Sequence, residues 1–344
     1  MSSETPSKRR VSWADITSPA RELTDAQPSP LASIPSPARF ALVVLSSLVL
    51  SSGLFTLTSS FTVGDLGPIS RHLEEWWEVG GLIGWRAIEV GLTWVLGYDG
   101  RDAASFLFLT HLPTYSLLSF FYHVRPTSAL AALGVTLVST TLPFVLLRRP
   151  SSVHDLSRAP ADAIPNRAIL QDKVTTLFTT LMAASVFSVV LYASYATWLP
   201  ARLVVHFEGL PDISAAHAGP AGLPVLFMTL IPAGWAARDF LFVSSTGHFA
   251  ETAETDPSPS PREGEYLIAS VYRATWGKLS TKTQVLIARS VTLAFGILLN
   301  TVVQVAGTIR DVSIEGAATW GAVWATAALI TGATFGWIEA VDGV

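Results

Sequence analysis

The segment from residue 79 to residue 97 (VGGLIGWRAIEVGLTWVLG) constrains the fold most, because it is a membrane-length apolar run with two charges near its middle. Arg86 and Glu89 stand three residues apart, so they share one face of a helix and can form an ion pair. Small residues gather on the opposite face of such a helix: Gly80, Gly84, Ala87 and Gly91. Charges inside a bilayer need partners or water, and small residues are useful where another backbone approaches closely. We therefore predict the buried central helix of a membrane bundle, with its glycine side pressed against another backbone.

The rest of the chain has a composition that fits the same class. Half of its 344 residues are hydrophobic and 14% are charged, whereas a soluble globular chain carries about 25% charged residues. Several apolar runs are close to the 20 residues that a membrane-spanning helix needs. We predict an all-α polytopic transmembrane helix bundle, residues 38–344, with a cytosolic loop at 238–283. About eight spans are expected, at residues 40–61, 79–97, 103–122, 128–147, 174–199, 221–237, 285–308 and 316–338. Such a protein has the lipid bilayer as its first partner.

The first 37 residues differ from this pattern. They are rich in Ser, Pro and Thr, carry mixed charge and contain few apolar residues, a composition typical of disordered segments. No apolar core occurs early enough for a cleavable signal peptide, so we expect a disordered tail that stays on the mature protein. The chain contains no cysteine, which excludes disulfides and thiolate chemistry.

Basic residues indicate the orientation of the bundle. With the N-terminus in the cytosol and eight spans, Arg86 lies within the membrane, and Arg289 near the start of the seventh span is counted with the cytosolic side. The far side then receives four of the 22 Lys and Arg residues: Arg71, Arg125, Arg202 and Arg310. The remaining seventeen fall on the cytosolic side, which is the bias of the positive-inside rule. We therefore expect both termini in the cytosol.

A polar cluster is expected in the membrane interior around the second and third spans. If these spans form an antiparallel hairpin about Gly100, Glu89 lies eleven residues before the turn and His111 eleven after it. Both side chains then lie roughly 16 Å from the turn, since an α-helix rises ~1.5 Å per residue. Asn300 and Gln304 on the seventh span are expected near the level of Arg86.

The sequence leaves two interpretations of this cluster open. One is a proton or solute pathway through Arg86, Glu89 and His111, because intramembrane ionisable groups often line such routes. The other is an internally neutralised ion pair that fixes helix register, surrounded by hydrogen-bonding partners. A membrane-embedded lipid-modifying enzyme is a third, less supported alternative, and no motif assigns a catalytic residue, a metal ligand or a cofactor. Three histidines expected on the far side are weak evidence for a metal site: His123, His206 and His217.

A short motif in the tail points to a partner. Lys8 to Asp15 reads KRRVSWAD, which resembles the docking motif by which regulatory subunits engage protein phosphatase type 1. In that motif a basic residue precedes Val or Ile, any residue, and then Phe or Trp. Arg10, Val11 and Trp13 match these positions. The resemblance implies a peptide that adds as an edge strand and places its two apolar side chains in pockets.

The tail and the large loop also contain candidate phosphorylation sites. Ser12 follows two arginines, so a phosphate there would add about two negative charges between the docking residues and weaken docking. Serines followed by proline are the other candidates: Ser18, Ser29, Ser36, Ser258 and Ser260.

The sequence therefore favours a membrane-embedded scaffold or adaptor with phosphorylation-controlled cytosolic segments. We expect it in the endoplasmic reticulum or the contiguous nuclear envelope, with no nucleic-acid partner. Nothing in the sequence determines its oligomeric state.

Overall fold

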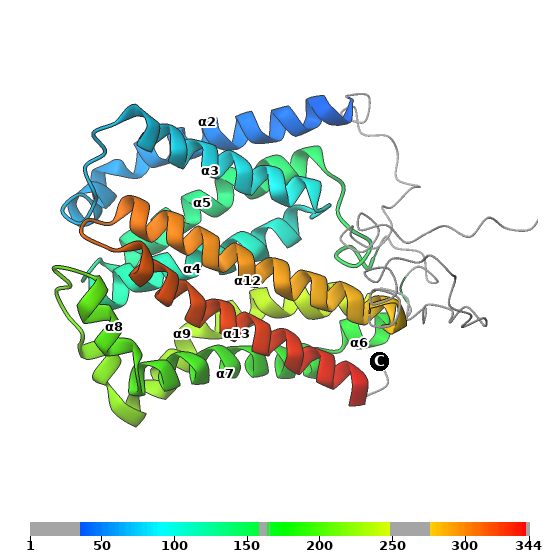
Figure 1. The fold of residues 1–344 in the computed structure, drawn as a ribbon. Coiled ribbons are helices and arrows are strands. Elements are labelled where there is room, and N and C mark those ends of the chain that lie inside the picture. Colours follow the sequence, from blue (N-terminus) through cyan, green and yellow to red (C-terminus); the bar gives the residue numbers. More distant parts are fainter. Residues whose placement is uncertain (1–34, 158–163, 165, 248–275, 342–344) are drawn as a thin grey trace, which may run out of the picture.

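The computed structural model describes residues 35–157, 164, 166–247 and 276–341, and the described residues are overwhelmingly helical. Figure 1 shows long, roughly aligned helices, with the first residue of the first helix and the end of the last helix at the same end of the bundle. The long helices are α2 (Ser36–Leu66), α3 (Trp76–Val95), α4 (Gly100–Phe121), α5 (Pro126–Leu147), α7 (Lys173–Ala196), α9 (Gly222–Ala237), α12 (Thr281–Thr308) and α13 (Ile314–Val341). This arrangement confirms the predicted all-α membrane bundle.

Seven helical segments of the described chain are long and apolar enough to cross a membrane by length and composition; α9 reaches that length only as part of the continuous segment Gly219–Thr246. The exception is α3, which carries two glutamates and an arginine within 20 residues. It nevertheless packs against α2 and α12 in the bundle. The span expected at residues 79–97 is thus present as a helix, although its charges set it apart from the other seven.

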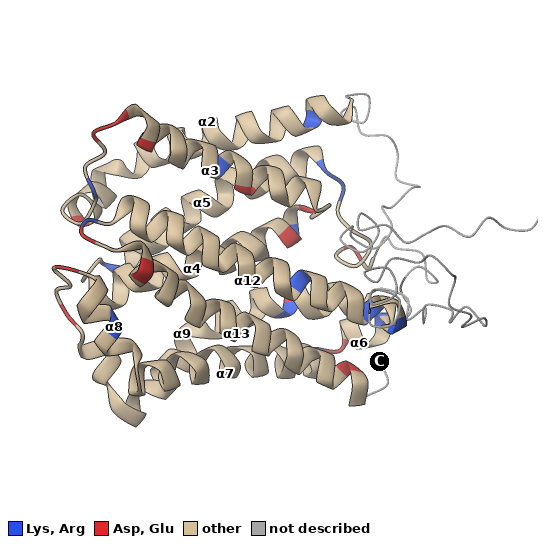
Figure 2. Cartoon of the chain, viewed as in Figure 1, with Lys and Arg blue, Asp and Glu red and all other residues tan. Residues whose placement is uncertain are grey.

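Charged residues mark the two ends of the bundle. Figure 2 shows most of them near the ends of the long helices. At the far end, an isolated bridge joins Ser70 to Ile309 and another joins Phe207 to Val312. These bridges tie together three separate far-side connections.

Local sequence explains where the helices begin. Asp99 accepts hydrogen bonds from the backbone N–H groups of Arg101 and Asp102 and caps α4, and Asp172 caps α7 in the same way. Proline occupies the first turn of α2 and of α5, where its missing N–H costs nothing. The helix α2 begins four residues before the expected span, so residues 36 and 37 belong to the bundle and not to the tail.

Close packing in the bundle depends on small residues of α9 and α13. A Cβ atom on Gly332 would lie 2.8 Å from the Cβ of Ser290, so α13 approaches α12 closely at this point. A Cβ on Gly234 would lie 2.8 Å from the backbone nitrogen of Ala184, which explains why α9 packs against α7. Small residues on α9 and α13 thus let these helices approach their neighbours closely.

The glycine side of α3 is a different case, and the prediction for it is wrong. A Cβ atom on Gly80 or Gly84 would meet nothing within 4 Å. Only Gly91, nearer the cytosolic end, is covered, by the ring of Phe40 at 3.5 Å. The helix is not central, because just four of its residues are buried and all four lie in its cytosolic half: Glu89, Val90, Gly91 and Thr93.

The expected loop at residues 238–283 begins later than predicted, and its residues 248–275 lie outside the described part of the chain. The chain does not leave the bundle after α9 but continues as a π-helix (Arg238–Val243) and a short helix, α10 (Ser244–Thr246). All nine of these residues are buried. Two charged side chains, Arg238 and Asp239, made the segment look like a loop, but both contact partners inside the protein.

Candidate functional site

The membrane interior contains a compact polar centre around Arg86, as the hairpin geometry predicts. Arg86 Nη1 donates to Glu89 Oε2 at 2.7 Å, and His111 Nε2 lies 2.9 Å from Glu89 Oε1. A carboxylate only accepts hydrogen bonds, so the imidazole donates through Nε2. The side chains of Glu89 and His111 are each 4% exposed, so these groups satisfy one another away from water.

The second guanidinium nitrogen of Arg86 is also occupied. Nη2 donates to the carbonyl oxygen of Thr136 at 2.8 Å and to the hydroxyl of Thr140, and the hydroxyl of Ser139 lies 3.4 Å away. These three residues lie on α5, so Arg86 links α3 to α5, while Glu89 links α3 to α4. A charge held by this many partners stabilises helix register.

Asn300 and Gln304 on α12 surround this centre in different ways. Asn300 accepts a hydrogen bond from Trp85 Nε1 at 2.9 Å and donates to the Thr110 carbonyl at 3.0 Å. It thereby joins α12 to α3 and α4, as expected for a polar interhelical contact. Gln304 does not contact the ion pair but lines a cavity beside His111.

This cavity of about 240 Å³ connects the polar centre to the far end of the bundle. His111, Thr114 and Gln304 line its inner part, and Ser70 and Ile309 of the far-side connections line its outer part. The Thr114 hydroxyl is buried and has no hydrogen-bond partner among the described residues. The cavity therefore has room and polar groups for water on the far side of His111.

The cytosolic side of the polar centre is closed by apolar packing. Val43, Val90, Ala103 and Phe144 form one buried cluster contributed by four helices. Ala103 lies about two turns from His111 and Phe144 about one turn from Thr140 in the cytosolic direction, and Val90 directly follows Glu89 on that side. Water that reaches His111 from the far side thus meets a dry barrier before the cytosol.

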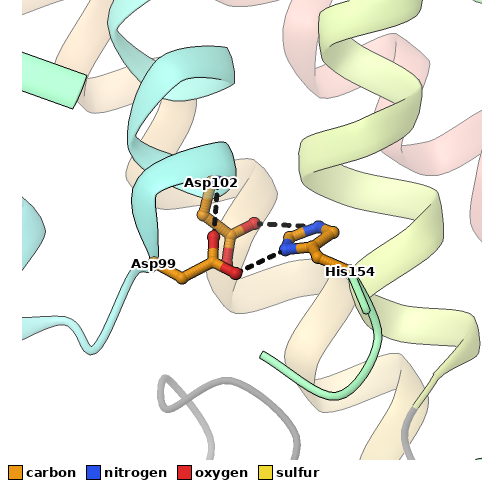
Figure 3. Close-up of side chains that lie close together, drawn as sticks. All are labelled: Asp99, Asp102 and His154. Carbon is orange, nitrogen blue, oxygen red and sulfur yellow. Dashed lines mark hydrogen bonds and ion pairs between the residues drawn. The ribbon is translucent and has the colours of Figure 1, made fainter. Parts of the chain in front are cut away.

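A second polar centre lies at the cytosolic end of the bundle and was not predicted. Figure 3 shows Asp99 and Asp102 at the start of α4 facing His154 from the loop after α5. His154 Nδ1 lies 2.8 Å from Asp99 Oδ2, and its Nε2 lies 3.9 Å from Asp102 Oδ1. The backbone N–H of Ser151 also donates to Asp99, at 2.8 Å.

Asp102 is held from the opposite side by Arg289 of α12. The two guanidinium nitrogens donate to its two carboxylate oxygens at 2.7 and 2.9 Å. Arg289 also donates to the Phe240 carbonyl at 3.0 Å, and it lies 5.0 Å from the ring centre of Tyr98 and 4.9 Å from that of Phe240. Bidentate geometry and two aromatic faces make this a strong site for a buried guanidinium.

The charges of this centre perturb the groups outside the spans. Burial disfavours the charged imidazolium of His154, but the negative charge of Asp102 and the hydrogen bond to Asp99 outweigh it, so the pKa of His154 is raised. Burial alone would raise the pKa of Asp99, yet the hydrogen bond and charge of His154 and the backbone donors lower it. Two carboxylates thus favour the charged form of His154 and face Arg289 from the other side.

Asp99, Asp102 and His154 each offer an atom within 4.8 Å of the others, a spacing that would admit a metal ion. The donor set does not fit one. Arg289 occupies both oxygens of Asp102, backbone N–H groups and His154 occupy Asp99, and His154 Nδ1 carries the proton of that bond. The arrangement is an ion-pair network that fastens the loop to the bundle.

Sequence patterns indicate only part of this centre. Arg289 is visible as a charge on the face that also carries Asn300, but its partner is 187 residues away. Asp99 and Asp102 resemble ordinary turn residues, and His154 lies in a polar loop. Nothing along the chain indicates that these elements meet.

The far-side histidines form no common site. His206 contacts Ser313 and Glu315, His123 faces Asp212 at 4.0 Å, and His217 contacts the Ile213 carbonyl. Each therefore has its own partner within the described chain.

The tail motif and most phosphorylation candidates lie outside the described residues. These are Arg10, Val11, Trp13, Ser12, Ser18, Ser29, Ser258 and Ser260. Ser36 is described, and it is the exposed first residue of α2.

Taken together, these features define a multi-pass α-helical membrane protein with two internally paired polar centres. The sequence model of the bouquet formation protein 3 C-terminal domain matches residues 172–303 of the chain. That stretch includes α7, α8 (Leu199–His206), α9 and most of α12. No curated protein and no solved structure shows significant similarity to the chain.

Proposed function

We propose that this protein is a membrane-embedded scaffold of the nuclear envelope that takes part in telomere bouquet formation. The match to the bouquet formation protein 3 C-terminal domain carries this proposal. It covers the helices that contribute Arg289 and Asn300, so the matched region includes side chains that hold the bundle together.

The geometry of the polar centres supports a scaffold. The guanidinium groups of Arg86 and Arg289 both donate hydrogen bonds to partners within the chain. A transported solute or a substrate would have to displace these partners, at the cost of leaving a buried charge unpaired. The cytosolic barrier of Val43, Val90, Ala103 and Phe144 also interrupts a continuous route through the bundle.

Localisation of the full-length protein tests this proposal. A fluorescent tag should give a nuclear rim in the cells of origin, and loss of the gene should reduce telomere clustering at the envelope in meiotic prophase. The tagged wild-type gene should restore clustering in the same cells. A plasma-membrane or vacuolar signal, or clustering unchanged by gene loss, would contradict the proposal.

The cavity beside His111 favours a second candidate, proton-coupled transport through Arg86, Glu89 and His111. It would supply the far-side half of a proton route. Proton flux into vesicles that contain the purified protein should then fall in a Glu89→Gln variant. A matched control is Thr110→Val, which removes a hydroxyl 3.5 Å from Glu89 but keeps the ion pair. Equal flux in all three proteins, or none in the wild type, argues for the scaffold.

We also propose that the tail recruits protein phosphatase type 1 through Arg10, Val11 and Trp13. Full-length protein in detergent should retain the phosphatase on a column, and a Val11→Ala/Trp13→Ala variant should not. A Ser12→Glu variant should bind more weakly than wild type because it adds negative charge between the docking residues. Equal retention of wild type and the double variant would remove this proposal.

A further inference from the structure

A buried arginine at the cytosolic end of the bundle is only partly neutralised by the protein. Arg238, the first residue of the π-helix, is 5% exposed, and its Nη2 donates to the Thr176 hydroxyl of α7 at 3.0 Å. The ion pair that it forms within the described chain is with Asp239, at 3.6 Å from Nη1, which is too long for a hydrogen bond. A hydroxyl carries no charge, so Arg238 lacks the closely bound anion that a buried cation needs.

Asp239 does not supply that anion, because Arg101 of α4 already holds it. Nε and Nη2 of Arg101 donate to the two carboxylate oxygens of Asp239 at 2.5 and 2.9 Å, which is the strong bidentate geometry. Asp239 and Arg101 are the charged groups that act on Arg238. Two cations thus share one carboxylate, and two positive charges against one negative leave the cluster with a formal charge of +1.

The other buried arginine of the described chain shows what is missing. Arg289 donates to both oxygens of Asp102 at 2.7 and 2.9 Å, so its charge is balanced within the protein. Arg238 has no carboxylate within hydrogen-bond length among the described residues. An anion from outside the chain would give Arg238 the partner that Arg289 finds inside it.

One nitrogen of Arg238 is free to meet such an anion. Nη2 is engaged with Thr176 and Nε is buried, whereas Nη1 makes no hydrogen bond to the described residues and keeps some accessible surface. The guanidinium carbon lies 5.6 Å from the ring centre of Trp235, which is 48% exposed. Because tryptophan is typical of membrane interfaces, the open side of Arg238 adjoins the lipid-facing surface.

The depth of Arg238 indicates the source of the anion. Its partner Thr176 lies three residues after the start of α7, which is ~4.5 Å along the helix axis, so the guanidinium lies near the level of the cytosolic headgroups. Lys173, the exposed first residue of α7, precedes Thr176 by three residues and shares its face. Phe178 on the next turn is 59% exposed, so acyl chains can lie against α7 below the two cations.

We propose that Arg238 binds the phosphate of an anionic phospholipid in the cytosolic leaflet through Nη1, with Lys173 as a second cation. The positive charge of the cluster favours a lipid with net negative charge. A zwitterionic lipid brings its own cation, for which the site offers no carboxylate, since Arg101 holds Asp239.

The experiment uses the full-length protein in detergent with a photoactivatable phosphatidic acid and a phosphatidylcholine that has the same photoactivatable chain. The phosphatidic acid should label residues 172–180 and 232–243 at least about fivefold more than the phosphatidylcholine, the effect of one charge near a membrane surface. Unlabelled phosphatidic acid should compete, and inorganic phosphate at the same concentration should not.

Two variants and one matched control complete the test. Arg238→Gln removes the cation but leaves Asp239 bound to Arg101, and it should reduce labelling at least about tenfold, the contribution of one hydrogen bond to a charged group. Lys173→Gln should reduce labelling about fivefold. The control Arg202→Gln removes the same charge at the far end of the bundle, where the side chain is 54% exposed, and should leave labelling unchanged.

The proposal fails if Arg238→Gln and Arg202→Gln are labelled equally, or if phosphatidylcholine labels these residues as well as phosphatidic acid does. Displacement by an equal concentration of inorganic phosphate would also overturn it, because the site would then bind a free anion and not a lipid. A thermal melt of each variant separates lost binding from lost folding. If Arg238→Gln does not fold, equal labelling of Lys173→Gln and Arg202→Gln would refute the proposal.

Discussion

Replacing Asp102 with alanine should destabilise the protein strongly, because it removes the carboxylate that both terminal nitrogens of Arg289 contact. The side chains of Asp102 and Arg289 are 1% and 2% exposed, so water cannot replace the lost partner. Deleting one member of a buried ion pair costs about 3–5 kcal/mol, because the other charge stays buried and uncompensated.

The surroundings of Arg289 place the expected loss toward the lower end of that range. The Phe240 carbonyl still accepts a hydrogen bond from Arg289, and the rings of Tyr98 and Phe240 still cover the guanidinium. Each such cation–π contact contributes about 0.5–2 kcal/mol. We therefore expect Asp102→Ala to lower the free energy of unfolding by about 3 kcal/mol.

The assay is equilibrium unfolding of the purified full-length protein in detergent, with Glu315→Gln as the control. Glu315 pairs with Arg202 at 3.4 Å, but the two side chains are 69% and 54% exposed. Loss of an exposed pair costs about 0–1 kcal/mol. A double variant, Asp102→Leu/Arg289→Met, should recover most of the stability because it removes both charges.

The differences in unfolding free energy between these variants test whether the pair of Asp102 and Arg289 is buried and uncompensated when broken. If Asp102→Ala and Glu315→Gln differ by less than about 1 kcal/mol, the pair is not desolvated as the structure shows. If the double variant is as unstable as Asp102→Ala, the loss arises from packing and not from an unpaired charge.

Three further outcomes follow from the same contacts. The raised pKa of His154 means that its contribution is fully present below its ordinary value of 6.5 and is lost as pH rises through the raised folded value. Asp99, with a lowered pKa, loses its contribution only as pH falls below its ordinary 3.8 and through the lowered value. Unfolding curves from pH 5 to 9 should thus show the wild type losing stability at high pH and His154→Gln showing a flatter profile. Gly332→Ala should cost about 1–3 kcal/mol by overpacking against Ser290, as measured by thermal or denaturant unfolding. Gly84→Ala should be neutral or stabilising by up to about 1 kcal/mol, since its Cβ meets open space; equal losses in the two glycine variants would contradict the packing described.

The contacts inside the hairpin of α3 and α4 can be predicted from the spacing of residues along the chain. Arg86 and Glu89 pair because three residues of helix put them on one face, and His111 joins them because equal helix lengths put it at the same depth. The same periodicity does not predict which element, if any, covers the glycine side of α3. Periodicity predicts a helix contact at Gly80 and Gly84, but a Cβ atom at either position would meet nothing within 4 Å.

Sequence alone determined the class of this protein, because the length and hydropathy of each span, the caps at Asp99 and Asp172, and the bias of basic residues all depend on neighbours along the chain. Tertiary structure decided which charges meet. The pair of Asp102 and Arg289 and the buried position of His154 both arise where distant parts of the chain pack side by side. Such contacts depend on the order and rotation of the helices in the bundle, and apolar periodicity leaves both undetermined when most faces of a membrane helix are hydrophobic.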